Sequence, residues 1–399
     1  MAGLAATVGS GAMTNSIKDI VEADVLLVTG SNTTEAHPVL SLQMKRAVRE
    51  RGARLILIDP RRIELADFAY LHLRQKPGTD VALFNGMAHA IIAHDWVNER
   101  FVRERTEGFE AVKTAVADWP PERAAIVTGI PPSKIVAAAR IYAMAKNSAI
   151  FWAMGITQHT TGTDNVKALS NLALLTGQIG RPGTGLNPLR GQNNVQGACD
   201  LGGLVNVFPG YQKVADEAAR RKFAAGWGVP YESLSPTPGL TVTEMMNGVL
   251  DGRIKGMYIM GENPMLSDPN LNHVRHALSQ IEFLALQDIF KNETAEMAHV
   301  ILPAASFAEK SGTFTNTERR VQLVRPVLPA PGEARPDWQI ITEIANRMGH
   351  AWSYDSPEDI FKEMAALTPQ YAGMSYERLA QGGLQWPCPT PDHPGTPVL

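Results

Sequence analysis

The chain contains only two cysteines in 399 residues, Cys199 and Cys388. They lie far apart and outside any C-x-x-C spacing, so this chain cannot by itself hold an iron-sulphur cluster, which usually takes four thiolates. The same scarcity excludes a framework of disulfides. We expect both cysteines to be free thiols in a reduced compartment, and therefore a cytoplasmic protein.

Long hydrophobic runs and an excess of basic charge are also missing. No apolar run approaches the roughly 20 residues of a membrane-spanning helix, and the first residues, MAGLAATVGSGAMTNS, have neither a charged leader nor an apolar stretch. The net charge is −3, with Lys and Arg dispersed among Asp and Glu. Without a basic stripe to neutralise phosphates, a nucleic-acid partner is not expected, and neither is a membrane span.

The chain does have a high apolar content, 44% of its residues, arranged in alternating strand and helix patterns. Continuous apolar runs typical of buried parallel strands occur in ADVLLVTG, ARLILIDP and AIFWAMG, with a shorter one in AYLHL. Helices are predicted for HPVLSLQMKRAVRERG, which ends at Gly52, for TDVALFNGMAHAIIAH, for PPSKIVAAARIYAMAK and for DNVKALSNLALLTG. The fold class is therefore α/β, and the first half of the chain is predicted to form one doubly wound lobe.

The alternation resumes later in the chain and predicts a second α/β lobe. The order is strand, helix, strand and short strand in KGMYIMGENP, PNLNHVRHALSQ, EFLALQDIF and AHVILP. SGTFTNTERRVQLV is predicted to be extended and half-exposed, and helices follow in DWQIITEIANRMG and PEDIFKEMAAL. We place the first lobe at 1–191, the second at 192–303, the extended segment at 304–333, helices that return to the second lobe at 334–385, and a proline-rich linker at 386–399.

Three polar loops follow predicted strands of the first lobe: GSN at 30–32, DPRR at 59–62 and PGTD at 77–80. In an open parallel sheet, ligands bind beyond the carboxyl ends of the strands. Asp59 is suited to accept hydrogen bonds from ribose hydroxyls or from the N–H groups of a guanine. Each loop alone is equally well explained as a turn that caps a helix, but together they favour a nucleotide. The first strand is followed by GSNTTE and not by G-x-G-x-x-G, which argues against NAD.

The second lobe carries loops at equivalent places, GENP at 261–264 and QDIFKNET at 287–294. Two lobes with matching loops indicate a ligand with two nucleotide-like ends. A structural duplicate that binds no ligand is the alternative.

The histidines give little sign of a metal site. His89 and His94 lie five residues apart on a predicted helix and so face different sides, which makes them a poor metal pair. His37, just before Pro38 at a helix start, is more interesting by its position, but a surface histidine is the commoner case there and is expected. No metal ligand is predicted within the chain.

The segment NPLRGQNNVQGACD, residues 187–200, lacks the apolar repeat of a strand or a helix and is predicted to be an ordered polar loop. It places one guanidinium, that of Arg190, among amides and glycines. The paired donors of Arg match a carboxylate, so the segment is suited to capture a small anion. Alternatively, Arg190 ties down its own loop by pairing with Asp200 or with a backbone carbonyl.

In order along the chain, these motifs resemble the middle of molybdopterin-dependent formate dehydrogenase catalytic (alpha) subunits, in the DMSO reductase-like molybdopterin oxidoreductase family. The resemblance covers essentially all residues and includes VTGSN, IDPRR, KPGTDVAL, WAMGITQHTTG, LTGQIGRPGTGLNPLRGQNNVQGACD, YIMGENP, QDIFKNETAEMAHVILPAASFAEKSGTFTNTERRVQ and DWQIITEIANRMG. It implies that two α/β lobes hold between them a molybdenum or tungsten ion on two molybdopterin guanine dinucleotides.

The resemblance also implies roles for individual residues. Arg190 would be the catalytic residue that orients formate, which is oxidised to CO2 at the metal. Cofactor contacts are implied for Gly30, Ser31, Asn32, Asp59, Pro60, Arg61, Gly78, Asp80, Gly155, Gln158, Gly191 and Gln192, and for Gly261, Glu262, Asn263, Gln287, Asp288 and Thr294.

The sequence departs from the family in what surrounds these lobes. Family members carry a Cys or selenocysteine that ligates the metal, followed by His, a few residues before the counterpart of Ala2-Gly3-Leu4, and neither is present here. The resemblance further implies an N-terminal domain with a four-cysteine iron-sulphur cluster and a C-terminal domain, and we expect both to lie outside this sequence. We expect a fragment of an open reading frame that is inactive alone and whose native partners are iron-sulphur or flavin and NAD-linked electron-transfer subunits or domains.

Two alternatives remain. A non-catalytic structural subunit of a redox complex would keep the lobes without the metal, but it would have no use for Arg190 and the adjacent QNN. A nicotinamide-dependent enzyme is disfavoured by the missing glycine fingerprint.

Overall fold

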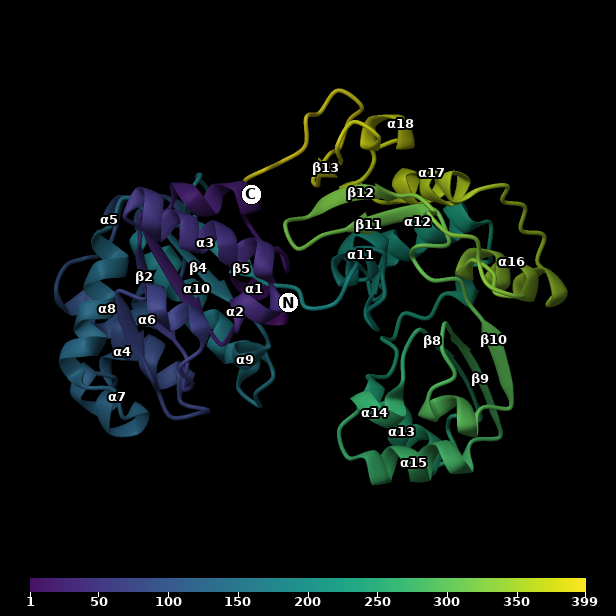
Figure 1. Cartoon of the computed structure of the whole chain (residues 1–399), viewed down its shortest axis with the longest axis horizontal. Helices are drawn as coiled ribbons and strands as arrows, with labels where there is room; N and C mark the ends of the chain where they lie inside the picture. Colours follow the sequence, from purple (N-terminus) through teal and green to yellow (C-terminus); the bar gives the residue numbers. More distant parts are fainter. The chain divides into compact units, whose positions relative to one another are not determined.

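The computed structural model describes residues 1–399, the whole chain, which forms two compact units (Figure 1). The first unit comprises Met1–Gln196, Thr315–Arg320 and Gly395–Leu399, and the second comprises Gly197–Phe314 and Val321–Pro394. Each unit contains its own parallel sheet, as the sequence predicts. The first unit extends to Gln196, beyond the expected boundary at residue 191.

The sheet of the first unit has five parallel strands in the order β3-β2-β1-β4-β5. The strands are β1 (Val25–Thr29), β2 (Arg54–Ile58), β3 (Leu71–Leu73), β4 (Ser148–Trp152) and β5 (Gly185–Pro188). Every residue of β1 and β4 is buried. Strands that are apolar throughout must be covered on both faces, which explains their continuous hydrophobic runs.

Helices cover both faces of this sheet. Side chains on alternate residues of β1 and β2, such as Leu27 and Ile56, pack against α4, α8 and α10. The intervening residues, such as Leu26 and Leu57, pack against α3. The helices of this unit are α1 (Ala2–Val8), α2 (Thr33–Ala36), α3 (Pro38–Arg51), α4 (Asp80–Ala93), α5 (Glu99–Arg105), α6 (Phe109–Ala117), α7 (Pro121–Thr128), α8 (Pro132–Met144), α9 (Met154–Thr157) and α10 (Gly162–Thr176), with short 3-10 turns η1 (Ile17–Glu22) and η2 (Glu64–Phe68).

Local signals set the ends of the longer helices where the sequence predicts them. α3 begins with Pro38 and ends at Gly52, whose φ of 71° lies in the left-handed region. α10 ends in the same way at Gly177, with a φ of 67°. A helix end in this conformation favours glycine, because other residues have a Cβ that clashes there.

The second unit contains a smaller parallel sheet of order β10-β9-β8. Its strands are β8 (Gly256–Met260), β9 (Phe283–Asp288) and β10 (Val300–Pro303), and its core includes side chains of α13 (Val242–Leu250), α14 (Pro264–Ser267), α15 (Leu271–Gln280) and the turn η5 (Glu293–Met297). The predicted order of strand, helix, strand and short strand is confirmed.

The remaining elements of the second unit are shorter. A sheet of order β11-β12-β13 joins β11 (Gly312–Thr315), β12 (Arg320–Val324) and β13 (Leu384–Gln385), and β6 (Val207–Phe208) pairs with β7 (Gln212–Lys213). The helices are α12 (Glu217–Trp227), α16 (Asp337–Arg347), α17 (Pro357–Leu367) and α18 (Tyr376–Leu379), with the turns η3 (Pro209–Tyr211) and η4 (Tyr231–Ser233).

The turn between β11 and β12 and the end of the chain both pack into the first unit. Arg319 is fully buried, and its guanidinium donates to the carbonyl oxygens of Met13 at 2.7 Å and Thr396 at 2.9 Å. Leu399 donates its backbone N–H to the carbonyl of Thr14 at 2.9 Å. The last residues of the expected linker are therefore ordered parts of a core.

The interpretation of residues 187–200 as a loop is wrong at both ends. Asn187 and Pro188 lie in the edge strand β5, and Val195–Asp200 forms the helix α11. The buried carboxylate of Asp200 accepts hydrogen bonds from Tyr211 and from Trp386. These long-range partners hold a helix that the local apolar pattern does not predict.

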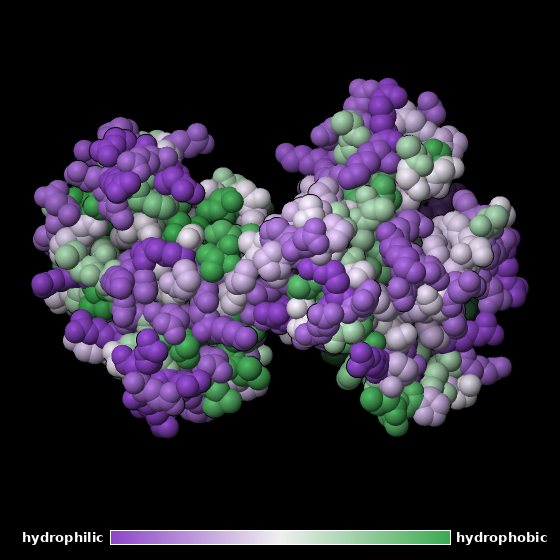
Figure 2. All heavy atoms as spheres, turned by 90° about the horizontal axis from the view of Figure 1, so that it is seen from above, coloured by the Kyte–Doolittle hydropathy of each residue, from purple (hydrophilic) through white to green (hydrophobic).

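No single helix is long and apolar enough to cross a membrane, although the bent pair of α7 and α8 passes that test by length and composition. Both helices contribute buried residues, such as Ala124 and Ile135, to the core of the first unit. The face seen in Figure 2 is mostly hydrophilic, with apolar atoms in separate patches.

Candidate functional site

A pocket of about 410 Å³ lies at the carboxyl edge of the first sheet. Because all five strands are parallel, the loops that follow them meet at this edge. Loops that follow each of the five strands contribute to the pocket. It brings together ten of the residues predicted to bind a cofactor, Gly30, Ser31, Asn32, Asp59, Pro60, Arg61, Gly78, Asp80, Gly155 and Gly191.

Two glycines let the loops after β1 and β4 touch. Gly30 has a φ of 57°, and a Cβ placed on it would lie 2.7 Å from the backbone of Gly155 and Ile156. The N–H of Gly155 donates to the carbonyl of Gly30 at 3.0 Å. Any larger residue at either position would push the two loops apart, so the glycines set the shape of this part of the pocket.

Two buried carboxylates line the pocket. Asp59 accepts a hydrogen bond from the backbone N–H of Arg61 at 2.8 Å, and Asp80 accepts one from Nε2 of Gln75 at 2.9 Å. Burial raises the pKa of the Asp80 carboxyl above its ordinary value of 3.8, and the hydrogen bond from Gln75 partly offsets this. Both side chains are hydrogen-bond acceptors.

Three further atoms of pocket residues are buried without a hydrogen-bond partner: Asn32 Oδ1, Gln75 Oε1 and His37 Nδ1. The Gln75 amide must turn its nitrogen towards Asp80, which leaves Oε1 as an open acceptor. A buried acceptor without a donor costs about 1–3 kcal/mol. A ligand rich in N–H and O–H groups, such as guanine with its ribose, would satisfy this set, so the residues present fit a guanine nucleotide.

The expectation of a surface histidine at position 37 is wrong. His37 is only 8% exposed, lines the pocket, and places Nε2 at 2.8 Å from the carbonyl oxygen of Arg190. Gln75 and His159 also line the pocket and were not singled out from the sequence. Their position in loops that follow strands was the signal available for finding them.

A second pocket, of about 210 Å³, gathers the remaining predicted residues of the first unit, those implied to contact the cofactor and the arginine implied to orient formate. It is lined by Gln158, Arg190, Gly191 and Gln192 together with Met1 and Gly11, among others. Gly191 lines both pockets.

Neutral groups hold the Arg190 side chain in this pocket. Its Nε donates to Gln196 Oε1 at 3.0 Å and its Nη2 donates to the carbonyl of Gly11 at 2.9 Å. Asp200, the acid considered as a partner, instead accepts hydrogen bonds from ring groups of the second unit, including Tyr211. Arg190 thus does tie its loop to the backbone, as one alternative has it, while its positive charge is not cancelled by either acceptor.

The predicted residues of the second unit also gather at the carboxyl edge of their sheet. Asn263, after β8, accepts a hydrogen bond from the Thr294 hydroxyl at 2.7 Å, and Asp288, at the end of β9, accepts one from Asn292 at 2.8 Å. Glu262 accepts a hydrogen bond from Ser267 at 3.2 Å, and Gly261 has a φ of 65°.

The amide of Gln287 is engaged on both atoms, as is that of Asn263, whose Nδ2 donates to Glu293 at 2.6 Å. The Gln287 side chain is fully buried, its Nε2 donates to Asp337 at 2.6 Å, and its Oε1 is paired with the Tyr258 hydroxyl. In this arrangement Gln287 fixes the sheet edge that presents the neighbouring loops.

The helix histidines make ordinary contacts. His89 Nδ1 lies 2.9 Å from the carbonyl of Val116, and His94 stacks on Trp96. The structure contains no cluster of three or more His, Cys, Asp or Glu side chains placed to hold a metal.

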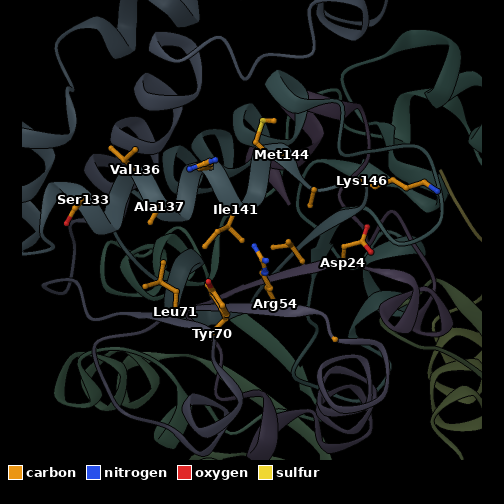
Figure 3. A pocket seen from close by; sticks show the side chains of 14 residues that line it. Asp24, Arg54, Tyr70, Leu71, Ser133, Val136, Ala137, Ile141, Met144 and Lys146 are labelled. Atoms are coloured by element: carbon orange, nitrogen blue, oxygen red, sulfur yellow. The ribbon is translucent and has the colours of Figure 1, made fainter.

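A cleft of about 960 Å³, larger than either of these two pockets, lies at the opposite edge of the sheet. Asp24, Arg54 and Leu71 line it from the amino ends of three strands (Figure 3). Figure 3 also shows Ile141 and Met144 from α8 on the other side of this cleft. None of the predicted site residues lines this cleft, because it lies at the amino ends of the strands and not at their carboxyl ends. The size of a cleft alone therefore does not identify the functional site.

The sequence of this chain is similar to those of known proteins. A family model described as molybdopterin oxidoreductase matches residues 2–347. The chain is 50% identical over 400 residues to the F420-dependent formate dehydrogenase subunit alpha of Methanocaldococcus jannaschii, covering all of this chain and 58% of that protein. It is 43% identical over 389 residues to formate dehydrogenase H of Escherichia coli, covering 97% of this chain and 54% of the other.

A solved structure shows the same fold. Acetylene hydratase from Pelobacter acetylenicus superposes with a TM-score of 0.76 at 22% identity, over 96% of this chain and 54% of that one. This chain thus spans somewhat more than half the length of the curated relatives cited above. With a family model matched over most of its residues, the chain belongs to the molybdopterin oxidoreductase family.

Proposed function

We propose that this chain is the cofactor-binding and formate-binding part of a formate dehydrogenase catalytic subunit. The reaction would be the oxidation of formate to CO2 at a molybdenum or tungsten centre carried by two molybdopterin guanine dinucleotides. Support comes from relatives at 43–50% identity whose names specify formate dehydrogenase. These relatives are longer than this chain, so the whole reaction is assigned to it only as a proposal.

The first dinucleotide would bind in the 410 Å³ pocket of the first unit. Asp59, Asp80 and Asn32 would accept hydrogen bonds from its guanine and ribose. Gly30 and Gly155, which let the loops after β1 and β4 touch, would set the shape of the pocket that receives it. The unpartnered acceptors of this pocket are the observation that supports this assignment.

The second dinucleotide would meet the loops after β8 and β9. Gly261, Asn263, Asp288 and Thr294 would contact it there, and Glu262 would add a carboxylate. The support is the repetition of the same strand-end geometry in the smaller sheet.

The neutral environment of Arg190 is the observation that carries the formate assignment. The acceptors of its guanidinium, Gln196 Oε1 and the Gly11 carbonyl, are uncharged, so its positive charge remains available for a carboxylate. Gln192 lines the same pocket and would donate a second hydrogen bond to the anion. Formate would be held through its oxygens, which leaves its C–H free to react.

The bound metal group would supply the two-electron redox chemistry. Formate would lose two electrons and a proton, and CO2 would leave without its negative charge. Loss of that charge weakens the attraction to Arg190, so the same residue that binds substrate would favour product release. The relatives include F420-dependent enzymes and formate dehydrogenase H, so we assign the electron acceptor to partner subunits rather than to this chain.

The cofactor assignment is tested by expressing the chain in a host that makes molybdopterin guanine dinucleotide. Acid hydrolysis of the purified protein should release two GMP molecules per chain. Release of one would limit binding to a single unit, and release of none would contradict this half of the proposal.

The formate assignment is tested by titrating the chain with formate at equilibrium. Replacement of Arg190 by Gln should weaken binding about tenfold or more, because a charge-assisted hydrogen bond contributes about 1.5–3 kcal/mol. The formate affinity of Arg190→Lys should lie between those of the unaltered protein and Arg190→Gln, since lysine keeps the charge and loses the paired donors. Arg46→Lys is the matched control, since Arg46 is exposed and pairs only with Glu50. Equal formate affinity in all variants would contradict the assignment of Arg190 to formate binding.

The nucleotide sequence upstream of codon 1 separates a catalytic subunit from a structural one. An in-frame UGA or Cys codon followed by a His codon would support the catalytic proposal. A reading frame without them would favour a structural subunit that keeps the lobes and lacks the metal.

A further inference from the structure

We propose that His37 is a positioning residue that couples the nucleotide pocket to Arg190. This inference rests on the proposed function, because it takes Arg190 as the residue that binds the anion. It concerns how the two pockets of the first unit act on each other.

The backbone of His37 is fixed from both sides. Its N–H donates to the carbonyl of Thr33 at 2.9 Å, and its own carbonyl accepts from Ser41 at 2.9 Å. It lies between α2 and α3 and is followed by Pro38, whose ring restricts its own φ and the conformation of the preceding residue. The imidazole is therefore carried on a rigid support.

The side chain of His37 joins two loops that are far apart in the sequence. Nε2 lies 2.8 Å from the carbonyl oxygen of Arg190, 153 residues away. A carbonyl oxygen only accepts hydrogen bonds, so Nε2 must carry the proton. The bond holds the peptide unit from which the guanidinium projects.

The other ring nitrogen, Nδ1, needs a different kind of hydrogen-bond partner. In the neutral ring, a proton on Nε2 makes Nδ1 an acceptor. Nδ1 is buried and has no partner, and His37 lines the nucleotide pocket beside the loops of Asp59 and Asp80. A donor on the nucleotide, either a ribose hydroxyl or a guanine N–H, would complete its hydrogen bonds.

The imidazole is a rigid plane, so holding one nitrogen limits the motion of the other. A nucleotide that engages Nδ1 would fix the direction of Nε2 and thereby the carbonyl of Arg190. Nucleotide in the larger pocket should then strengthen anion binding in the smaller one. By thermodynamic reciprocity, the anion should strengthen nucleotide binding by the same factor.

Two substitutions at His37 test the roles of the two ring nitrogens separately. His37→Gln extends an amide to the place of Nε2 and can still donate to the Arg190 carbonyl, but it has no group at the place of Nδ1. His37→Asn keeps a polar group near the place of Nδ1 and is too short to reach Arg190. His94→Gln, on an exposed histidine that stacks on Trp96, is the control.

The experiment measures the formate dissociation constant of the full chain with and without saturating guanosine 5′-diphosphate. In the unaltered protein the nucleotide should tighten formate binding about fivefold, a size typical of coupling between sites. His37→Gln and His37→Asn should both lose this effect. His37→Asn should also weaken formate binding without nucleotide more than His37→Gln does, while His37→Gln should weaken nucleotide binding more. A purely structural role would not produce this crossed pattern.

Other outcomes show whether the coupling through His37 or the proposed function itself is wrong. An unaltered protein in which nucleotide has no effect on formate binding, or a His37→Gln variant with full coupling, overturns the coupling. Formate affinity that does not change in Arg190→Gln overturns the proposed function instead. A chain that does not bind the nucleotide at all overturns both. Thermal unfolding of each variant shows whether it is folded, and the two variants serve as each other's check.

Discussion

The backbone N–H of Arg190 donates a hydrogen bond to Thr317 Oγ1 at 3.1 Å, across 127 residues of sequence. The Thr317 hydroxyl in turn donates to the carbonyl of Pro188 at 3.2 Å. His37 holds the carbonyl of Arg190 at the same time. The residue proposed to bind formate is thus clamped through its backbone from both sides, and the turn between β11 and β12 provides one side of the clamp.

Replacing Thr317 by Val should weaken formate binding about fivefold, because one neutral hydrogen bond contributes roughly 1 kcal/mol. Thr317→Ser keeps the hydroxyl, so its formate affinity should be close to that of the unaltered protein. The measurement is the equilibrium titration with formate. A Val variant that binds as tightly as the Ser variant would show that the backbone clamp does not position Arg190.

Asp80 should make the stability of the ligand-free chain depend on pH. Burial raises its folded-state pKa above the ordinary 3.8, so its charged form is disfavoured in the folded protein. The resulting loss of folding free energy is present at pH 7. It decreases as the pH falls through the raised pKa of the folded state, and it vanishes below the pKa of the unfolded state. Asp80→Asn should therefore raise the Tm at pH 7, with a gain that shrinks towards pH 3.8.

The same variant should bind guanosine 5′-diphosphate more weakly, because the amide replaces a charged acceptor of the pocket. Asn keeps an oxygen that can accept from Gln75, so the loop itself should be preserved. Unfolding curves across pH together with nucleotide titrations check both effects. A variant that is less stable at pH 7 would contradict the role of burial.

The close approach at Gly30 should make it intolerant of even one methyl group. Gly30→Ala meets a left-handed φ, which costs about 1–2 kcal/mol, and crowds Gly155 and Ile156, which costs about 1–3 kcal/mol more. Gly52→Ala is matched in φ, at 71°, and its Cβ would meet nothing within 4 Å. The difference between the two variants in urea unfolding isolates the crowding term. Equal losses would show that the loops after β1 and β4 can separate at little cost.

Asp200 should be a stability determinant of the second unit. Its carboxylate accepts hydrogen bonds at 2.7 Å from the hydroxyls of Tyr211 and Tyr371 and from Nε1 of Trp386. Asp200→Leu should destabilise by about 3 kcal/mol or more, since each buried donor left without an acceptor costs about 1–3 kcal/mol. Asp200→Asn should cost much less, because its oxygen can serve Trp386 and Tyr371 while the Tyr211 hydroxyl turns to accept. Denaturant unfolding that ranks Leu as no worse than Asn would contradict this reasoning.

The sequence alone was sufficient where structure follows from local pattern. The continuous apolar runs of β1, β2 and β4 indicated buried parallel strands, because only such strands are apolar on both sides. Gly52 and Gly177 marked helix ends through the left-handed conformation they adopt. Polar loops after parallel strands place Asp59, Asp80 and Gly30 at one edge of the sheet, because the carboxyl ends of parallel strands meet there.

The sequence was insufficient where structure depends on partners far away along the chain. The helix α11 has no apolar repeat and is held by Asp200 through Tyr211, Tyr371 and Trp386, which no local window contains. His37 looked like a surface residue because its partner, the carbonyl of Arg190, lies 153 residues away. The fold class and the strand-end loops were determined by short-range periodicity, which every segment carries in itself. The tertiary structure alone decided which polar atoms are buried and which remain without partners, because burial depends on which distant segments pack together.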